Sequence, residues 1–76
     1  MKQLVLHLAR GLVREPGRVR VHEHAEGERT ILELEVAPGD LGRVIGRDGR
    51  TASALRVLVS ALARRRGRSL ELEILD

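Results

Sequence analysis

Three arginines surround a glycine-rich turn in the middle of the chain. The stretch reads Gly42-Arg43-Val44-Ile45-Gly46-Arg47-Asp48-Gly49-Arg50-Thr51. Glycines at both ends of a four-residue turn permit positive φ angles, and they have no Cβ that would keep another backbone away. Backbone N–H groups in such a turn, together with the start of a following helix, form an anion site. The pattern predicts that a sugar-phosphate backbone lies against Gly46–Gly49, beside the flanking arginines.

Positive charge is concentrated around and after this turn. Residues 43–68 contain eight arginines and one acid, Asp48, whereas residues 1–42 carry six basic and seven acidic side chains. A localised basic region favours a polyanionic partner. For Arg64, Arg65 and Arg66 the simpler interpretation is a solvated helix end, whose cations complement the helix dipole.

The composition excludes several classes of site. The 76 residues contain no Cys, Phe, Tyr or Trp, so neither thiolate metal sites nor base stacking on aromatic rings is available. His22 and His24 would share one face of a strand but lack a third ligand in reach, so we expect a solvated face and no metal. Neither Ser53 nor Ser60 has a neighbouring base that could activate it. We expect a protein that is not an enzyme, with no cofactor and no small-molecule substrate.

The elements before the turn follow from the spacing of apolar residues. A helical period predicts an amphipathic helix over roughly residues 2–14, which Pro16-Gly17 ends. Alternation then predicts strands around residues 18–22 and 32–36, joined by a turn at Glu26-Gly27-Glu28 into an antiparallel hairpin. After the break at residues 37–40, Asp40 is expected to cap a short helix over residues 41–45.

The elements after the turn complete the order α-β-β-α-α-β. A longer helix is predicted over about residues 51–66, with Gly67 at its C-terminal end. Alternation from Leu70 to Ile74 predicts a third strand. Each strand has one apolar and one charged face, which predicts an α+β two-layer sandwich with helices on one face. A right-handed crossover would make the second and third strands parallel, giving a three-stranded mixed sheet.

The length of the chain predicts one small domain over residues 1–76. The apolar runs are only a few residues long, which predicts no membrane-spanning segment. The first residues lack the charged and apolar pattern of a signal peptide. We therefore expect a soluble, cytoplasmic protein.

The stretch Val44-Ile45-Gly46-Arg47-Asp48-Gly49 resembles the V-I-G-x-x-G signature of KH domains. The predicted element order is similar to the type II KH arrangement. The length and residues 42–56 further resemble the small stand-alone bacterial KH proteins of the KhpA type. This resemblance implies single-stranded RNA binding, in which the GxxG loop clamps the backbone of about four nucleotides.

The resemblance also implies a set of site residues. Carried over to this chain, they are Arg43, Ile45, Gly46, Arg47, Asp48, Gly49, Arg50 and Thr51. Within this set, Ile45 and Thr51 would line the start of a groove for the bases. Asp48 departs from the basic loops that bind well, and we expect it to cap the following helix. The family further implies RNA chaperoning, together with a second KH-containing protein or as a homodimer.

Other interpretations of the same residues remain open. The chain could be a protein-interaction or dimerisation module that uses the helix over residues 4–13 or a sheet edge. The turn could also be a plain connection between two helices. A DNA-binding helix-turn-helix is less favoured, because Thr51-Ala52-Ser53-Ala54-Leu55 offers few polar side chains for reading bases.

Overall fold

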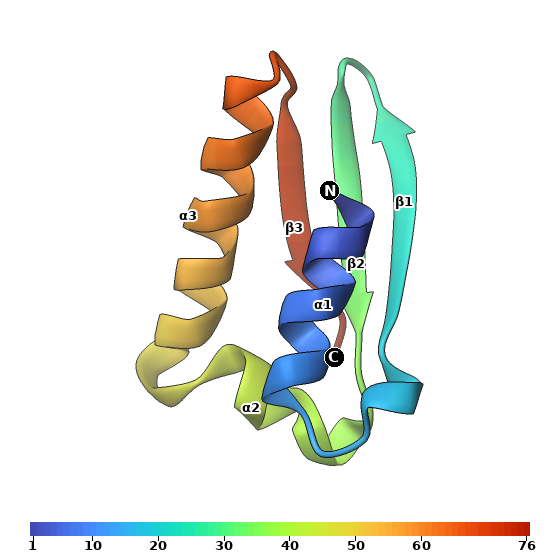
Figure 1. Ribbon diagram of the computed structural model, residues 1–76, viewed down its shortest axis with the longest axis vertical. Coiled ribbons are helices and arrows are strands. Elements are labelled where there is room, and N and C mark those ends of the chain that lie inside the picture. Colours follow the sequence, from blue (N-terminus) through green and yellow to red (C-terminus); the bar gives the residue numbers. More distant parts are fainter.

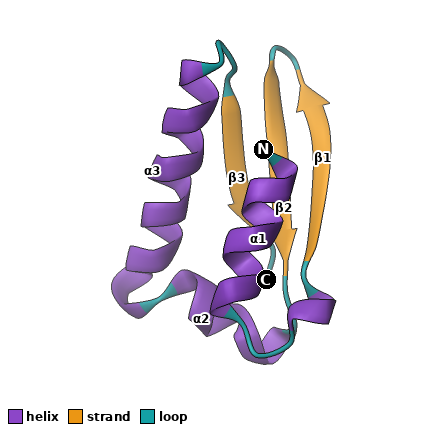
Figure 2. Cartoon of the chain, in the orientation of Figure 1, coloured by secondary structure: helices purple, strands orange, loops and turns teal.

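The computed structural model describes residues 1–76 and contains three α-helices and three strands (Figures 1 and 2). In chain order they are α1 (Lys2–Leu12), β1 (Arg20–Glu26), β2 (Arg29–Glu35), α2 (Leu41–Ile45), α3 (Arg50–Arg65) and β3 (Leu70–Ile74). Single 3-10 turns cover Pro16–Arg18, Pro38–Asp40 and Arg47–Gly49. The expected order α-β-β-α-α-β is confirmed.

The three strands form one mixed sheet in the order β1-β2-β3. Strands β1 and β2 are antiparallel, with Val21 opposite Leu34, and β2 and β3 are parallel, with Leu32 opposite Leu72. The parallel pair is possible because α2 and α3 carry the chain back across the sheet before β3 begins. The predicted sheet is therefore confirmed.

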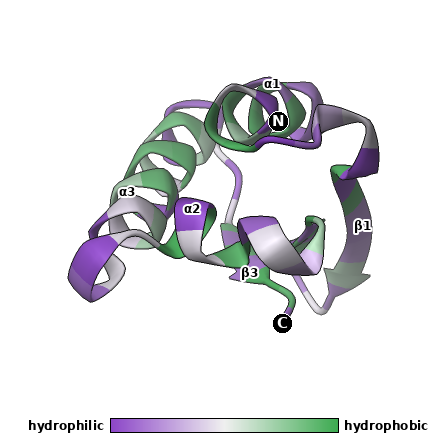
Figure 3. Cartoon of the chain, turned by 90° about the horizontal axis from the view of Figure 1, so that it is seen from below, coloured by the Kyte–Doolittle hydropathy of each residue, from purple (hydrophilic) through white to green (hydrophobic).

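The hydrophobic core lies between the sheet and the helices, which cover one face only (Figure 1). Val5 and Ala9 of α1, and Leu55 and Val59 of α3, are buried against the apolar side of the sheet. Viewed from below, both long helices carry apolar residues along their length (Figure 3). Leu32 and its neighbour Leu34 are fully buried in the central strand. Truncating such a core leucine to alanine typically costs about 2–5 kcal/mol.

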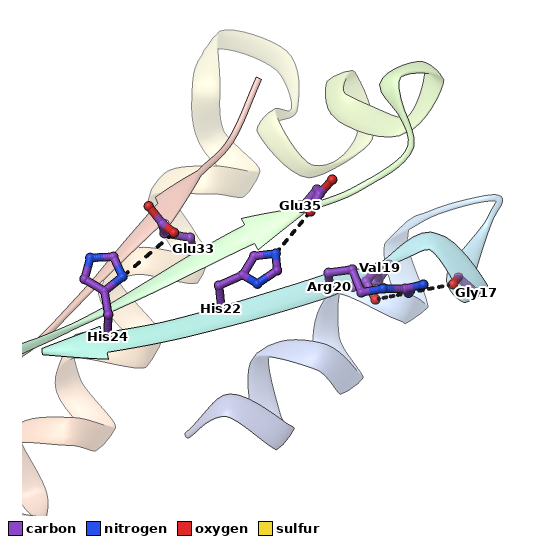
Figure 4. A network of polar contacts seen from close by, with 7 residues as sticks. All are labelled: Gly17, Val19, Arg20, His22, His24, Glu33 and Glu35. Carbon is purple, nitrogen blue, oxygen red and sulfur yellow. Dashed lines mark hydrogen bonds and ion pairs between the residues drawn. The ribbon is translucent and has the colours of Figure 1, made fainter.

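The outer sheet face carries charged side chains that pair across the strands (Figure 4). His22 Nε2 lies 3.1 Å from Glu35 Oε1, and His24 Nδ1 lies 3.8 Å from Glu33 Oε1. Arg20 donates to the carbonyl of Gly17 at 2.9 Å. Glu33 and Glu35 on this face therefore each pair with a histidine of the neighbouring strand.

Asp40 does not cap α2, so that expectation is wrong. No side chain caps this helix. The carboxylate of Asp40 turns toward the chain after α1 and accepts hydrogen bonds from the amides of Arg14 (3.1 Å) and Glu15 (3.0 Å). These bonds hold the chain in an extended conformation after Leu12, so α1 ends two residues earlier than its apolar period predicts.

The C-terminal end of α3 is closed by a Schellman motif, which confirms the role predicted for Gly67. Gly67 has a φ of +68°. Its amide donates to the carbonyl of Arg64 at 3.0 Å, and the amide of Arg68 donates to Ala63 at 2.9 Å. None of the helices has the length and apolar composition needed to cross a membrane.

Candidate nucleic-acid interface

The glycine-rich stretch forms a tight bend between α2 and α3, which we call the GxxG loop (Gly46–Gly49). Gly46 has φ 77° and ψ 172°, Asp48 has φ 56° and ψ 25°, and Gly49 has φ 73° and ψ 13°. Two hydrogen bonds close the bend, from the amide of Gly49 to Gly46 O (3.1 Å) and from the amide of Gly46 to Gly42 O (2.9 Å). Both glycines thus adopt the positive φ that the sequence predicts.

The two glycines are required for different reasons. A Cβ built on Gly46 would overlap Thr51 Oγ1 and would lie 2.9 Å from the Thr51 amide nitrogen, so the start of α3 needs this space. A Cβ built on Gly49 would meet nothing within 4 Å. Gly46 therefore serves packing within the chain, whereas the space around Gly49 is open to another molecule.

The three arginines predicted around the loop are not equivalent. Arg47 and Arg50 are exposed, and neither takes part in an ion pair. Arg43 Nε lies 3.5 Å from Asp40 Oδ1, and the Asp40 side chain is only 3% exposed. Since the charge of Arg43 is largely compensated, Arg47 and Arg50 supply most of the positive field at the loop.

Asp48 does not cap α3, contrary to expectation. No side chain accepts a hydrogen bond at the start of α3. Asp48 instead occupies a left-handed backbone conformation that Asp and Asn tolerate better than most residues. No side chain accepts a hydrogen bond from the leading N–H groups of α3, which begin beside Arg47 and Arg50, and the amide of Arg50 donates to the carbonyl of Arg47.

Of the two residues predicted to line the start of a groove, Ile45 and Thr51, only Thr51 borders one. Thr51 borders a shallow apolar groove of about 190 Å³ between α1 and α3. The residues around this groove are Leu8, Leu12, Thr51, Ala54, Leu55 and Leu58. Ile45 is 36% exposed while its neighbour Val44 is buried, but Ile45 does not border this groove. Thr51 also lies directly against Gly46, so it contacts both the GxxG loop and this groove.

Sequence reasoning missed a second hollow, the cleft between α3 and β3. Its volume is about 360 Å³, and it is lined by Arg29, Arg56, Ser60, Ser69, Leu70, Glu71 and Leu72. Arg56 Nε donates to the carbonyl of Leu72 at 3.2 Å, which joins the helix to the strand. The isolated arginine at position 56 in a helix of mainly apolar and small residues is the one signal that could have indicated it.

The chain is similar in sequence to known proteins over most or all of its length. Residues 2–74 match the family described as KhpA/KhpB, KH domain. The chain is 50% identical over 76 residues to RNA-binding protein KhpA of Halalkalibacterium halodurans, covering all of both chains. It is 46% identical over 77 residues to RNA-binding protein KhpA of Aquifex aeolicus, covering all of this chain and 96% of the other.

A third relative, RNA-binding protein KhpA of Leifsonia xyli, is 49% identical over 70 residues, covering 92% of this chain and 90% of the other. No solved structure gave a significant match. The fold, the position of the GxxG loop and these relatives together lead to one conclusion: the chain belongs to the KhpA/KhpB family of KH domains.

Proposed function

We propose that this chain binds single-stranded RNA, with residues 1–76 acting as one KH domain. The GxxG loop receives the sugar-phosphate backbone of about four nucleotides. Relatives over the whole chain are named RNA-binding proteins, which supports the proposal. The role is binding rather than catalysis, and we place it in the cytoplasm.

One observation carries the proposal. The two arginines without ion-pair partners, Arg47 and Arg50, lie beside an open glycine, Gly49, and beside a helix start that no side chain caps. Guanidinium groups and backbone N–H groups together are well suited to phosphate oxygens. Since Gly49 has no Cβ, a nucleotide backbone can approach the main chain closely.

The proposed clamp contacts backbone more than base edges, so we expect weak to moderate affinity and little sequence preference. Asp48 lowers the net charge of the loop to zero and so limits affinity further. Weak, sequence-tolerant binding suits an RNA chaperone, which must release its strands. A strand-annealing assay with two complementary labelled oligonucleotides would show faster duplex formation in the presence of the protein.

The first test is Arg47→Asp, with Arg18→Asp as a matched control. Arg18 is equally exposed and forms no ion pair or side-chain hydrogen bond. Reversing one charge at the clamp should weaken binding of a fluorescent single strand by about 30-fold, at roughly 1 kcal/mol per unit charge. The control should change affinity by less than about threefold, because screening weakens distant charges. Unchanged binding by Arg47→Asp, with unchanged melting, would favour a protein-interaction role.

A second candidate function, pairing with another KH domain, is favoured by the apolar groove between α1 and α3. Leu58 is 43% exposed there, and Leu12 is 36% exposed. Exposed leucines that border one groove are typical of a surface that another protein covers. The occupant that we propose is a second copy of this chain or another KH-containing protein. Pairing would also raise RNA avidity, because each domain contacts few nucleotides.

Leu58→Glu tests the pairing. If the groove receives a second copy, light scattering of the unaltered chain gives a dimer mass and the variant gives a monomer mass. Val57→Glu is the control, since Val57 is 67% exposed and does not border the groove. A monomer mass for the unaltered chain would exclude the homodimer and leave the other KH-containing protein, to be tested by mixing the two.

A further inference from the structure

Four arginines gather at the end of α3 that is opposite the GxxG loop. We call Arg64, Arg65, Arg66 and Arg68 the C-terminal arginine cluster. All four are exposed, and none forms an ion pair with an acidic side chain. The one polar side-chain contact in the cluster joins an Arg66 guanidinium nitrogen to Met1 Sδ at 3.7 Å. The cluster is therefore a strong positive field that the protein itself does not neutralise.

Helix stabilisation explains only part of this cluster. Arg64 and Arg65 lie in the last turn of α3, where cations complement the helix dipole. Arg68 lies after the helix has ended, as the last residue of the Schellman motif. That motif already satisfies carbonyls of the last turn, so the guanidinium groups are not needed as their donors. The cluster is thus free to contact an external anion.

The length of α3 determines how long an RNA strand must be to reach from the GxxG loop to the C-terminal arginine cluster. At about 1.5 Å per residue, the 16 residues of α3 span about 24 Å. Nucleotides stacked at about 3.4 Å each would cover this distance with about seven residues of RNA. Seven exceeds the roughly four nucleotides that a GxxG loop holds. A strand that leaves the clamp along α3 therefore reaches the cluster.

The cleft between α3 and β3 provides a path along that helix. Arg56 and Ser60 border it, and Arg64 follows them at the same four-residue spacing. Residues at this spacing lie on one face of a helix, so Arg56 lies between the loop and the cluster. The acid at the rim, Glu71, is already paired with Arg29 at 3.1 Å. The lining of the cleft therefore contains positive charge and no uncompensated acid.

We propose that the C-terminal arginine cluster is a second phosphate-contact site for the same RNA strand, so that the chain holds about seven nucleotides along α3. The inference rests on the proposed RNA binding, and it extends that function with a site that the GxxG signature does not contain. The α3–β3 cleft connects the two sites, with Arg56 as an intermediate contact.

The test compares two strand lengths and two matched variants. Oligouridylates of four and ten nucleotides, labelled with a fluorophore, are titrated and followed by anisotropy. The cluster variant is Arg64→Gln/Arg65→Gln/Arg68→Gln, which leaves the Arg66 contact with Met1 intact. The control variant, Arg10→Gln/Arg14→Gln/Arg18→Gln, removes the same charge from exposed arginines whose side chains form no ion pair or hydrogen bond.

The expected result is a loss that depends on length. The cluster variant should bind the ten-nucleotide strand about tenfold more weakly and the four-nucleotide strand less than twofold more weakly. The salt slope for the longer strand should become shallower by about 1.4, for two lost phosphate contacts. The control variant should leave both affinities within about twofold, because its charges lie outside the path.

Several outcomes would overturn the second site. Equal losses for both lengths would mean that the cluster acts only through a general field, and no loss at all would remove it from the interface. The proposed clamp is tested separately. If the GxxG loop did not bind RNA, the Arg47→Asp variant would bind the four-nucleotide strand as tightly as the unaltered chain does. The unaltered chain can be tested by crosslinking with two ten-nucleotide strands, one with 4-thiouridine at its 5′ end and one with it at its 3′ end. Only one of the two strands should crosslink to residues 64–68.

Discussion

Two exposed turns of this molecule each contain an open glycine but have different surroundings. The hairpin between β1 and β2 and the GxxG loop each contain an open glycine with positive φ, Gly27 at +66° and Gly49 at +73°. In the hairpin, Arg29 is paired twice, with Glu26 at 3.2 Å and with Glu71 at 3.1 Å. At the GxxG loop Arg43 is paired with Asp40, but Arg47 and Arg50 form no ion pair. Turn geometry alone is therefore not a binding signal, and uncompensated charge beside the turn is what distinguishes the candidate site.

The largest difference between the two turns should appear in the free energy of unfolding, when a glycine of each turn is replaced by alanine. Gly46→Ala should lower the free energy of unfolding by about 3 kcal/mol or more, because its conformation is nearly exclusive to glycine and its Cβ would meet Thr51. Gly27→Ala should cost about 1–2 kcal/mol, the strain of a left-handed residue with open space around it. Urea denaturation of both variants measures the difference. Equal losses would mean that Thr51 moves aside.

Charge reversal should separate the GxxG loop from the other exposed arginines in RNA affinity. Arg47→Glu/Arg50→Glu should weaken binding about 1,000-fold, because both changes place negative charge beside phosphates, at roughly 1 kcal/mol per unit charge. Arg10→Glu/Arg18→Glu changes the net charge equally at exposed arginines outside the loop and the α3–β3 cleft, and it should weaken binding less than about threefold.

For the unaltered chain and a four-nucleotide strand, log K should fall with log [salt] at a slope of about −1.5 to −2, as two or three phosphate contacts on a single strand require. A slope near zero, or equal losses in the two double variants, would contradict the assignment of the loop.

The presence or absence of an ion pair should also determine how much each arginine near the loop contributes to RNA affinity. Arg50→Gln should weaken binding about fivefold, the loss of one charge worth about 1 kcal/mol near a phosphate. Arg43→Gln should weaken it less than twofold, since Asp40 already compensates Arg43. Anisotropy titrations at about 0.1 M salt measure both. If Arg43→Gln were the more damaging, RNA would have to displace the ion pair with Asp40.

The smallest expected effect is a gain of affinity at Asp48. Asp48→Asn should strengthen binding about threefold, because it removes the one negative charge within the loop. Asn also tolerates the left-handed conformation, so stability should not fall. The hairpin counterpart, Glu28→Gln, should leave affinity unchanged. A loss of affinity at Asp48→Asn would show that the carboxylate takes part in binding.

Local patterns predicted most of the fold, because most of its determinants are local. Apolar periods located the helices and the third strand, Gly67 marked the end of α3, and the crossover rule made β2 and β3 parallel. The first two strands were placed only approximately, because they extend further toward the hairpin turn than the alternation around residues 18–22 and 32–36 indicated. The failure at Asp40 has a different origin. Its hydrogen-bond partner Arg14 is 26 residues away, and no period or capping rule reaches that far.

The sequence indicated the residues of the candidate site, but not how they contact one another. The spacing of Gly46 and Gly49 indicated the bend that the structure contains. The start of α3 determines that Gly46 must leave space for Thr51, while Gly49 faces open space. Likewise, Arg43 could not be separated from Arg50 before Asp40 was known to be buried beside it.

The positive φ angles of Gly46, Asp48 and Gly49 have a kinetic consequence. Folding has already selected these torsions, so an arriving strand does not have to wait for the bend to form. Preorganised surfaces of this kind vary little in association rate from one ligand to the next. We therefore expect residence time, not speed of capture, to decide which transcripts stay bound.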